Sequence, residues 1–460
     1  TLVAFACIRA HQADIGGGAA GSYNSEAREI FHEGLRLPVM KLIAGGETRQ
    51  DIWRLLMINT RTAEALDGDL RAMIGSTRIG ADRIGELVEE LSPARYRDYF
   101  HGILEHADRG FRRCVDAIPD GDYVAEEAID NDCFDPLDDA VRVRLGVKGD
   151  NLEVDFTGSA PQVRGFKNSS IANTWSAAYM ALASYFDPDL PHNEGAFRCV
   201  TITAPEGSIV NARPPAAMTM NTVFVAHEIV HAIWKALNQA LPERSCAGWA
   251  KAIHGPTSGR TDTASPFVMY HWNAASGGGG VDGRDGFNQI GHLIALGGLV
   301  LPNVETYEQL YPVRFHRQEF RTDAAGPGAY RGGTGCDFEV EINVPAEYAF
   351  RGEGLYNTSC FGAAGGRAGE PGDMNLTFAG GDTEQPKKYA VRHLDPLTLR
   401  AASPGGGGWG DPKQRDPAKV LRDVRDGVVS REAAAAIYGV VIDADGKNID
   451  DDATAARRSG

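Results

Sequence analysis

The first long pattern of apolar and polar positions in this chain is helical. Between Ile52 and Leu104, apolar residues recur every three or four positions, and charged residues fill most of the others. This spacing collects the apolar side chains on one face of an α-helix. Pro93 disfavours helical backbone in the residue before it. We therefore expect a break at Ser92 and a further helix to about Ile118.

From Asp122 the pattern changes to the alternation of apolar and polar residues that is typical of strands. It predicts strands at 141–145, 152–156, 200–202, 267–272, 313–321 and 338–342. Helical spacing returns twice, at 173–186 and 223–241. The chain opens with the apolar, β-prone run Leu2–Ile8, which predicts a strand entered in the middle of a domain.

These elements predict a mixed α+β protein with several domains. A chain of 460 residues is too long for one ordinary core. We expect a strand, loop and helical module over residues 1–120, and a mixed sheet-and-helix body over 121–400. A glycine-rich turn and a helical tail would follow over 401–460.

Composition narrows the classes of partner. The net charge of −16 argues against nucleic acid or an anionic membrane, because neither attracts an acidic surface. No stretch approaches the roughly 18 apolar residues that span a bilayer, and no signal peptide is evident. The seven cysteines are dispersed without a C-x-x-C pair. They indicate reduced thiols, and we expect a cytoplasmic protein.

One short motif suggests a zinc protease. His227-Glu228-Ile229-Val230-His231 matches H-E-x-x-H, in which two histidines one helical turn apart share a metal and the glutamate acts as base. The following residues, AIWKAL, lack the G-x-x-H that supplies a third ligand in metzincins. We interpret His227 and His231 as helix residues that are partly buried or face a partner.

The most informative local pattern lies near the C-terminus. SPGGGGWGDP (Ser403–Pro412) precedes a helical stretch from Pro417 to Val441. Consecutive glycines adopt backbone conformations closed to other residues, and Trp409 gives this segment a side chain to bury. A flexible linker has no such anchor. The pattern predicts either a well-packed loop before a terminal helix pair or a close approach to a ligand.

The same segment resembles the C-terminal signature of the hydantoinase B/oxoprolinase family. Six further blocks agree in the same order along the chain and extend the resemblance over essentially its whole length. They are RAHQADIGG (Arg9–Gly17), EIFHEGLRLPVMKL (Glu29–Leu42), VDFTGSAPQVRGFKN (Val154–Asn168), APEGSIVNARPPAA (Ala204–Ala217), LYPVRFHRQEFR (Leu310–Arg321) and GAYRGGTG (Gly328–Gly335).

The resemblance implies a subunit of an ATP-dependent cyclic-amide hydrolase that opens hydantoin, 5-oxoproline or lactam rings. An alternative is a subunit of an acetone- or acetophenone-type carboxylase, which acts on a ketone; a zinc protease or a purely structural subunit ranks last. The family's ATP site, with its Mg²⁺, lies on a separate hydantoinase A-like subunit, so we expect a hetero-oligomer. This chain accordingly has no G-x-x-x-x-G-K-[ST] phosphate loop.

The resemblance also implies a divalent metal, with zinc, manganese and iron all suited to His and Asp ligands. The family's first histidine in this block maps to His11, with Asp14 as a helper, and its other ligands precede this block. We therefore expect a segment before Thr1, or another chain, to complete the site. Relatives often carry a second histidine where this chain has Gln12, which puts the substrate class in doubt.

Four further residues are candidates for substrate contact. Glu33 and Arg36 are charged residues in an otherwise apolar block, where an internal ion pair is the alternative. Arg164 and Asn168 surround a turn of small residues and could hold a carboxylate or carbonyl. The alternative is a strand–turn–strand held by a buried arginine–aspartate pair. The run Gly277–Gly280 resembles a flexible loop at a cleft.

Overall fold

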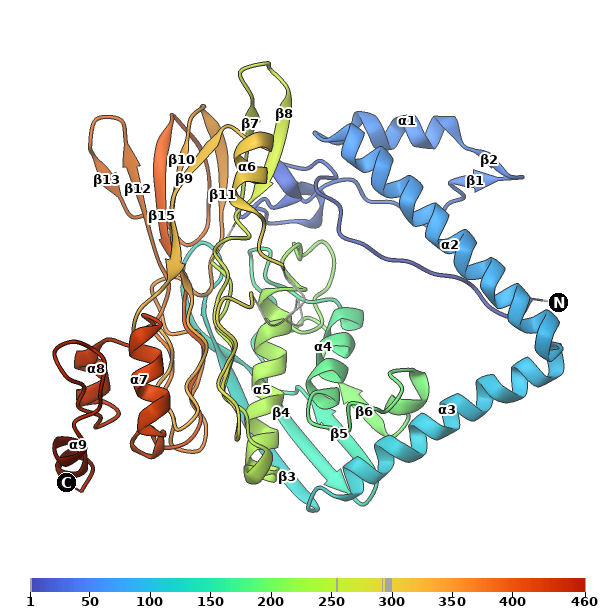
Figure 1. Ribbon diagram of the computed structural model, residues 1–460. Coiled ribbons are helices and arrows are strands. Elements are labelled where there is room, and N and C mark those ends of the chain that lie inside the picture. The colour runs from blue at the N-terminus through green and yellow to red at the C-terminus, as the bar shows by residue number, and fades with distance from the viewer. Residues whose placement is uncertain (1, 254, 292, 294–299, 460) are drawn as a thin grey trace.

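The computed structural model describes residues 2–253, 255–291, 293 and 300–459. These residues form a helical arm, a body built from three sheets, and a small helical cluster at the C-terminus (Figure 1). The predicted mixed α+β class is confirmed. No helix in the described ranges is both long and apolar enough to cross a membrane.

The arm is the helical segment of residues 50–116. It comprises α1 (Gln50–Ile58), α2 (Ala63–Leu91) and α3 (Pro93–Asp116), so the predicted break at Ser92 is confirmed. The helices α2 and α3 form a V that projects from the body (Figure 1). Only Leu66 of α2 is buried, whereas the second half of α3 buries Phe111 and Val115.

The strand predicted at Leu2–Ile8 is wrong. This segment has no regular secondary structure and pairs with no described strand. It runs beside α2, where Ala6 lies close to Gly80 and the Gln12 side-chain amide contacts Met73 at 3.4 Å. A β-prone sequence forms a strand only where another edge can accept its hydrogen bonds, and a helix offers none.

The first sheet of the body follows the arm. Its strand order is β3 (Gly121–Asn131), β4 (Pro136–Lys148), β5 (Asn151–Asp155) and β6 (Val200–Thr203). All pairs are antiparallel except β5 and β6. The helices α4 (Ile171–Ala183) and α5 (Phe224–Ala240) share one hydrophobic core with this sheet. Because α5 buries 14 of its 17 residues, it is a central helix of the body.

Two further sheets pack face to face around a second core. One has the order β14–β11–β7–β8, and the other has the order β13–β12–β15–β10–β9. The bounds of these elements and of the short helix beside them are β7 (Pro256–Arg260), β8 (Pro266–Tyr270), α6 (Val304–Leu310), β9 (Val313–Phe320), β10 (Cys336–Ile342), β11 (Ala346–Phe350), β12 (Asp373–Phe378), β13 (Thr383–Glu384), β14 (Ala390–Leu394) and β15 (Leu397–Ala402). A two-stranded ribbon, β1 (Ile43–Ala44) with β2 (Glu47–Thr48), precedes the arm.

Glycine-rich segments cross the body without forming regular strands, and we call them the glycine stack. Its members are residues 246–250, 277–280, 326–335, 361–369 and 403–408. Backbone hydrogen bonds join them, such as Gly280 N–H to the Gly407 carbonyl at 2.9 Å and Gly406 N–H to the Gly333 carbonyl at 3.0 Å. An added Cβ at Gly279 would lie 2.0 Å from the Ala247 oxygen. Only glycine permits such close layers.

The structure supports the packing interpretation of the C-terminal glycine run. Gly405–Gly408 are buried, and the Trp409 indole N–H donates to Ser245 Oγ at 2.9 Å. Gly277–Gly280 are mainly buried within the same stack. The run is therefore not an open, flexible loop, because neighbouring layers hold its backbone on both sides. Its predicted place at a cleft is confirmed, since Gly279 lines a cavity of about 460 Å³.

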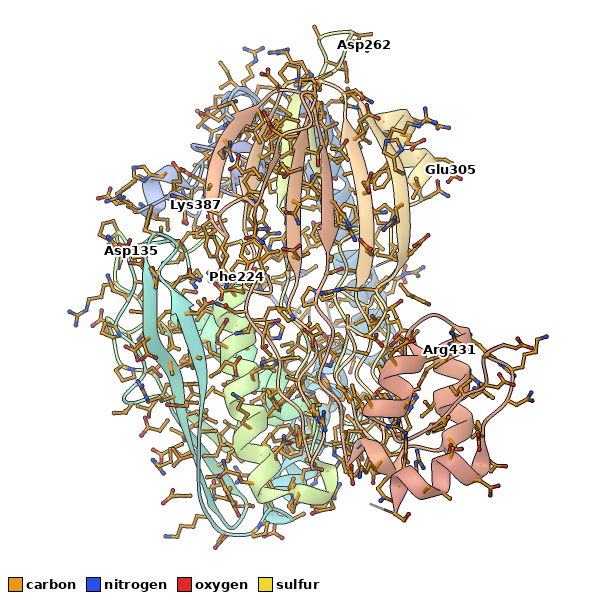
Figure 2. The ribbon with its side chains drawn as sticks, turned by 90° about the vertical axis from the view of Figure 1, so that its left-hand side faces the viewer. Asp135, Phe224, Asp262, Glu305, Lys387 and Arg431 are labelled. Carbon is orange, nitrogen blue, oxygen red and sulfur yellow. The ribbon has the colours of Figure 1, made fainter. Side chains whose placement is uncertain are left out.

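The C-terminal cluster contains α7 (Pro417–Arg425), α8 (Arg431–Ala436) and α9 (Asp451–Arg458) around a small core of its own. Arg431 marks it at the side of the body in Figure 2. The buried guanidinium of Arg415 joins it to the body, with ion pairs to Asp285 at 2.6 Å and to Asp423 at 2.7 Å.

Candidate functional site

Residues 13–22, which we call the N-terminal loop, are held by a buried carboxylate. Asp14 is 1% exposed and accepts hydrogen bonds from the backbone N–H groups of Gly16, Gly21 and Arg61, each at 2.9 Å. The Thr60 hydroxyl and the Arg61 guanidinium donate to it as well, the latter at 3.1 Å. With five donors and a cation, the carboxylate is fully satisfied. Asp14 therefore organises the loop.

The body fixes the other side of the N-terminal loop. The Tyr270 hydroxyl donates to the carbonyls of Ala13 and Gly21, and Glu347 Oε1 accepts the Ala20 N–H at 2.7 Å. A cleft of about 700 Å³ lies beside this loop. We call it the N-terminal cleft; its charged lining residues are Arg61, Arg260, Glu347, His393 and Asp395. The cleft next to the N-terminal loop is therefore lined by side chains of both charges.

His11 lies immediately before the N-terminal loop and is exposed. It forms no hydrogen bond or ion pair with other described residues in this structure, so no acceptor fixes its ring. No group of three or more His, Cys, Asp or Glu side chains suitable for a metal occurs within the described ranges. Asp14 does not fit a metal ligand, because its two oxygens already accept five hydrogen bonds. His11 alone supplies one ligand at most.

Glu33 and Arg36 do not form the internal ion pair offered as an alternative. Glu33 is buried, and its Oε1 accepts the backbone N–H groups of Met218 at 2.8 Å and Thr219 at 2.7 Å. Burial raises the pKa of its carboxyl, against those hydrogen bonds. Arg36 is exposed, with its guanidinium 5.1 Å from the centre of the Phe31 ring. Glu33 therefore links its own segment to residues 218–219, whereas Arg36 is exposed to solvent.

Asn168 is buried inside the turn that it was predicted to flank. Its amide donates to the carbonyls of Val163, Gly165 and Ala217, and its oxygen accepts the Val163 N–H. It has no surface to offer a substrate in this structure. Arg164 is half exposed and pairs with Asp132 at 2.6 Å and Asp135 at 2.5 Å. The alternative of a buried arginine–aspartate pair is therefore wrong, because Arg164 pairs at the surface with two aspartates of another segment.

The H-E-x-x-H segment lies in the interior. His227 and His231 are fully buried on α5, and their Nε2 atoms are 3.0 Å apart. His231 Nδ1 lies 3.2 Å from Glu127 of β3, and Lys251 pairs with Glu127 at 3.0 Å and with Glu228 at 2.9 Å. The prediction of buried helix residues is confirmed. The two imidazoles are occupied by each other and by Glu127.

In this buried network, the positive charges of the lysines offset the negative charges of the glutamates. Burial acts to raise the pKa of Glu127, but the ammonium of Lys251 and the His231 ring hold it well below its usual range. Burial lowers the pKa of His231, which favours the neutral ring. Burial raises the pKa of Glu228 to about 7 in spite of Lys251. Such groups stay buried only while each keeps its partner.

A second buried pair lies beneath an open groove of about 910 Å³. Lys167 pairs with Glu353 at 2.5 Å, and the Tyr389 hydroxyl donates to the same carboxylate. Tyr389 and Asn131 line the groove, and Lys167 donates to Asn131 at 3.1 Å. Arg164 lies next to this surface through its partner Asp135, which also lines it.

Several residues of these networks could not be recognised from sequence patterns. Arg61 follows a short helix without any motif, and only the need to neutralise buried Asp14 explains it. Glu127 and Lys251 lie 104 and 20 residues from His231 (231 − 127 and 251 − 231), so no local spacing connects them. A glutamate at an inward-facing position of β3, Glu127, would be the one hint that a buried partner for the two histidines exists.

The fold is an α+β body with a projecting helical arm, and a loop held by hydrogen bonds beside a cleft with charged lining residues provides a candidate small-molecule site. The family model for hydantoinase B/oxoprolinase matches residues 1–412. The chain belongs to this family, and the resemblance seen in the sequence blocks is confirmed.

Individual relatives agree over nearly the whole chain. Caprolactamase subunit beta of Pseudomonas jessenii is 34% identical over 100% of this chain and 80% of its own length. The crystal structure of the ATP-dependent caprolactamase from Pseudomonas jessenii matches with a TM-score of 0.88 and 33% identity, over 97% of this chain and 78% of that one. A nucleotide-free acetone carboxylase structure matches with a TM-score of 0.87 at 21% identity, over 98% and 67%, which shows a shared fold.

Proposed function

We propose that this chain is a subunit of an ATP-dependent cyclic-amide hydrolase, and that it binds the ring while a separate subunit uses ATP. The observation that carries this proposal is the similarity to caprolactamase subunit beta over the full length of the chain. The N-terminal cleft is the proposed substrate site, because it combines a mainly apolar lining with charged side chains beside a loop fixed by Asp14, Tyr270 and Glu347.

The glycine runs support a separate ATP-binding partner. A phosphate-binding loop needs backbone N–H groups that point at the phosphate. In the glycine stack these groups are already used. Gly277 N–H donates to the Pro404 carbonyl, Gly280 N–H to Gly407 and Gly407 N–H to Gly248, at 2.9–3.0 Å. We therefore place ATP and Mg²⁺ on a hydantoinase A-like subunit.

The first quarter of the chain offers a surface for that partner. Of the 22 large hydrophobic side chains recorded as exposed in the described ranges, 16 lie before residue 104. On α3, Tyr99, Phe100 and Ile103 are 51–54% exposed. They continue, at helical spacing, the same face that buries Ala107 and Phe111 against the body. Concentrated apolar exposure of this kind marks a protein–protein contact.

The proposed chemistry divides between the two subunits. The partner transfers a phosphoryl group to the amide oxygen of the ring, which makes the ring carbon a better electrophile. Water then adds to that carbon and the C–N bond breaks, which frees the amine and leaves an acyl phosphate at the other end of the opened chain. A second water hydrolyses the acyl phosphate, so phosphate and the open-chain amino acid leave. In this chain, Arg61 and Arg260 line the cleft and provide cations for the phosphorylated oxygen. A divalent metal would supply Lewis-acid chemistry, and we propose that His11 contributes one of its ligands.

The test is reconstitution with the ATPase subunit, followed by assays of ATP hydrolysis with a lactam, hydantoin, 5-oxoproline, or a ketone with bicarbonate. Ring opening coupled to ATP supports the proposal. Carboxylation of the ketone alone, or saturable ATP binding by the isolated chain, would refute it. His11→Ala should lower the metal content measured by elemental analysis and abolish turnover, while the unfolding midpoint stays unchanged. Exposed His106→Ala is the matched control.

A further inference from the structure

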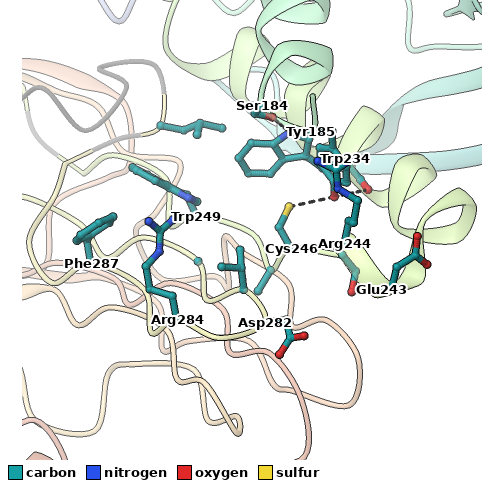
Figure 3. Close-up of a pocket in the computed structure, with 15 residues that line it drawn as sticks. Ser184, Tyr185, Trp234, Glu243, Arg244, Cys246, Trp249, Asp282, Arg284 and Phe287 are labelled. Carbon is teal, nitrogen blue, oxygen red and sulfur yellow. Dashed lines mark hydrogen bonds between the residues drawn. The ribbon is translucent and has the colours of Figure 1, made fainter. Parts of the chain in front are cut away.

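A further pocket, partly open to solvent, lies where the end of α5 meets the glycine stack. Its volume is about 460 Å³, within the range of small-molecule sites. We call it the aromatic pocket, because its apolar wall consists of Tyr185, Trp234, Trp249, Phe287 and Leu293 (Figure 3). It shares no lining residue with the N-terminal cleft.

The floor of the aromatic pocket is rigid. The Tyr185 hydroxyl lies 3.1 Å from Cys246 Sγ and also bonds to Asn238, whose amide donates to the Cys246 carbonyl at 2.9 Å. Burial raises the pKa of the Cys246 thiol to about 12, so it stays protonated. The neighbouring Ser245 accepts the Trp409 N–H from the glycine stack. A pocket with a fixed floor loses little entropy when a ligand binds.

The rim of the aromatic pocket carries four charges. Glu243 and Arg244 follow the end of α5, and Asp282 and Arg284 follow the glycine run. Arg244 and Arg284 lie on opposite sides of the pocket in Figure 3. None of the four forms an ion pair with another described side chain. Arg284 contacts only the Phe287 ring among aromatic groups, at 5.0 Å.

This mixture of charges selects a ligand class. A simple anion would face Glu243 and Asp282, and a simple cation would face both arginines, so each meets repulsion. A zwitterion satisfies both signs, while the rings cover an apolar chain between its ends. We propose that the aromatic pocket binds an ω-amino carboxylate. This is the class that opening of a lactam ring produces, and that identification rests on the proposed function.

The test uses the intact purified protein and three probes that share a six-carbon chain. They are 6-aminohexanoate, hexanoate and hexan-1-amine. Titration calorimetry and quenching of tryptophan fluorescence report binding, and Trp249→Phe assigns the optical signal to the pocket. We expect 6-aminohexanoate to bind at least about tenfold more tightly than either single-charge probe, because each lacks one ion pair.

Variants separate the contributions of the rim. Arg284→Gln and Glu243→Gln should each weaken 6-aminohexanoate binding about tenfold, and the gap between zwitterion and single-charge probe should close. Arg314→Gln, an exposed arginine on β9, is the control and should have no effect. Circular dichroism confirms that each variant is folded.

Equal binding of all three probes, tighter binding of hexanoate, or no saturation by about 10 mM would overturn the proposal. Binding that survives Arg284→Gln and Glu243→Gln would overturn it too. The measurement needs neither ATP nor the partner subunit. If the protein binds the zwitterion but shows no ring-opening activity, only the proposed function is refuted. If it opens rings but does not bind the zwitterion, only the proposal for the aromatic pocket is refuted.

Discussion

Replacing Gly406 with alanine should destabilise the body strongly, although it adds only one methyl group. A Cβ at this position would lie 2.1 Å from the Gly278 oxygen, where 3.0 Å is the practical minimum. The layers must therefore separate by nearly 1 Å. That movement breaks two buried hydrogen bonds, Gly406 N–H to the Gly333 carbonyl at 3.0 Å and Gly326 N–H to the Gly406 carbonyl at 2.8 Å.

Each of the two broken buried hydrogen bonds costs about 1–3 kcal/mol, so the expected loss is about 2–6 kcal/mol. The entropy of unfolding is about 1 kcal/mol/K for a chain of 460 residues, so the apparent midpoint of thermal unfolding, followed by circular dichroism, should fall by about 2–6 °C. Gly68→Ala is the control, because Gly68 lies within α2 with nothing within 4 Å of an added Cβ. It should raise helix stability by about 0.5–1 kcal/mol. A Gly406→Ala protein as stable as its parent would refute this account of the stack.

Three further predictions concern the buried network on α5. Lys251→Met removes the ion pair of Glu228, while Glu127 keeps Lys235 at 2.7 Å and His231 at 3.2 Å. The variant should lose about 3–5 kcal/mol in urea unfolding, and no loss would show that buried Glu228 does not depend on the Lys251 ammonium. The pKa of Glu228 is about 7 when folded and 4.5 in its ordinary state, so the folded protein binds the extra proton and loses stability as the pH rises between these values. The decline amounts to about 3 kcal/mol, and Glu228→Gln should flatten it when unfolding is measured at several pH values. His231→Gln should leave bound metal unchanged in elemental analysis, and a stoichiometric loss would identify the H-E-x-x-H segment as the metal site.

Elements with strong periodicity were predictable from the sequence. The arm helices, α4, α5 and strands β4, β5, β6, β8, β9 and β10 all occur where the patterns indicated. The break at Ser92 followed from Pro93 because the restriction of backbone by proline is local. Local rules succeed where the deciding interaction lies within a few residues along the chain.

The predictions that were wrong share one cause: the residues that determine the local structure lie far away in the sequence. Leu2–Ile8 has a strand-like composition but meets helix α2. The glycines at 277–280 look flexible, yet carbonyls of residues 333, 404 and 407 surround them. Asp14 resembles a free carboxylate until two donors of Arg61 and three other donors occupy it. None of these partners could be assigned from spacing alone.

The two histidine candidates show how burial and access separate the roles of one residue type. A catalytic metal needs a coordination position that substrate and water can reach. His231 has no exposed surface, and its two nitrogens already face His227 and Glu127. His11 has exposed surface and lies at the end of a loop that five hydrogen bonds to Asp14 hold in place. A side chain that is accessible, next to a rigid loop and without a partner among the described residues can take up an incoming ligand; one that is sealed within a network cannot.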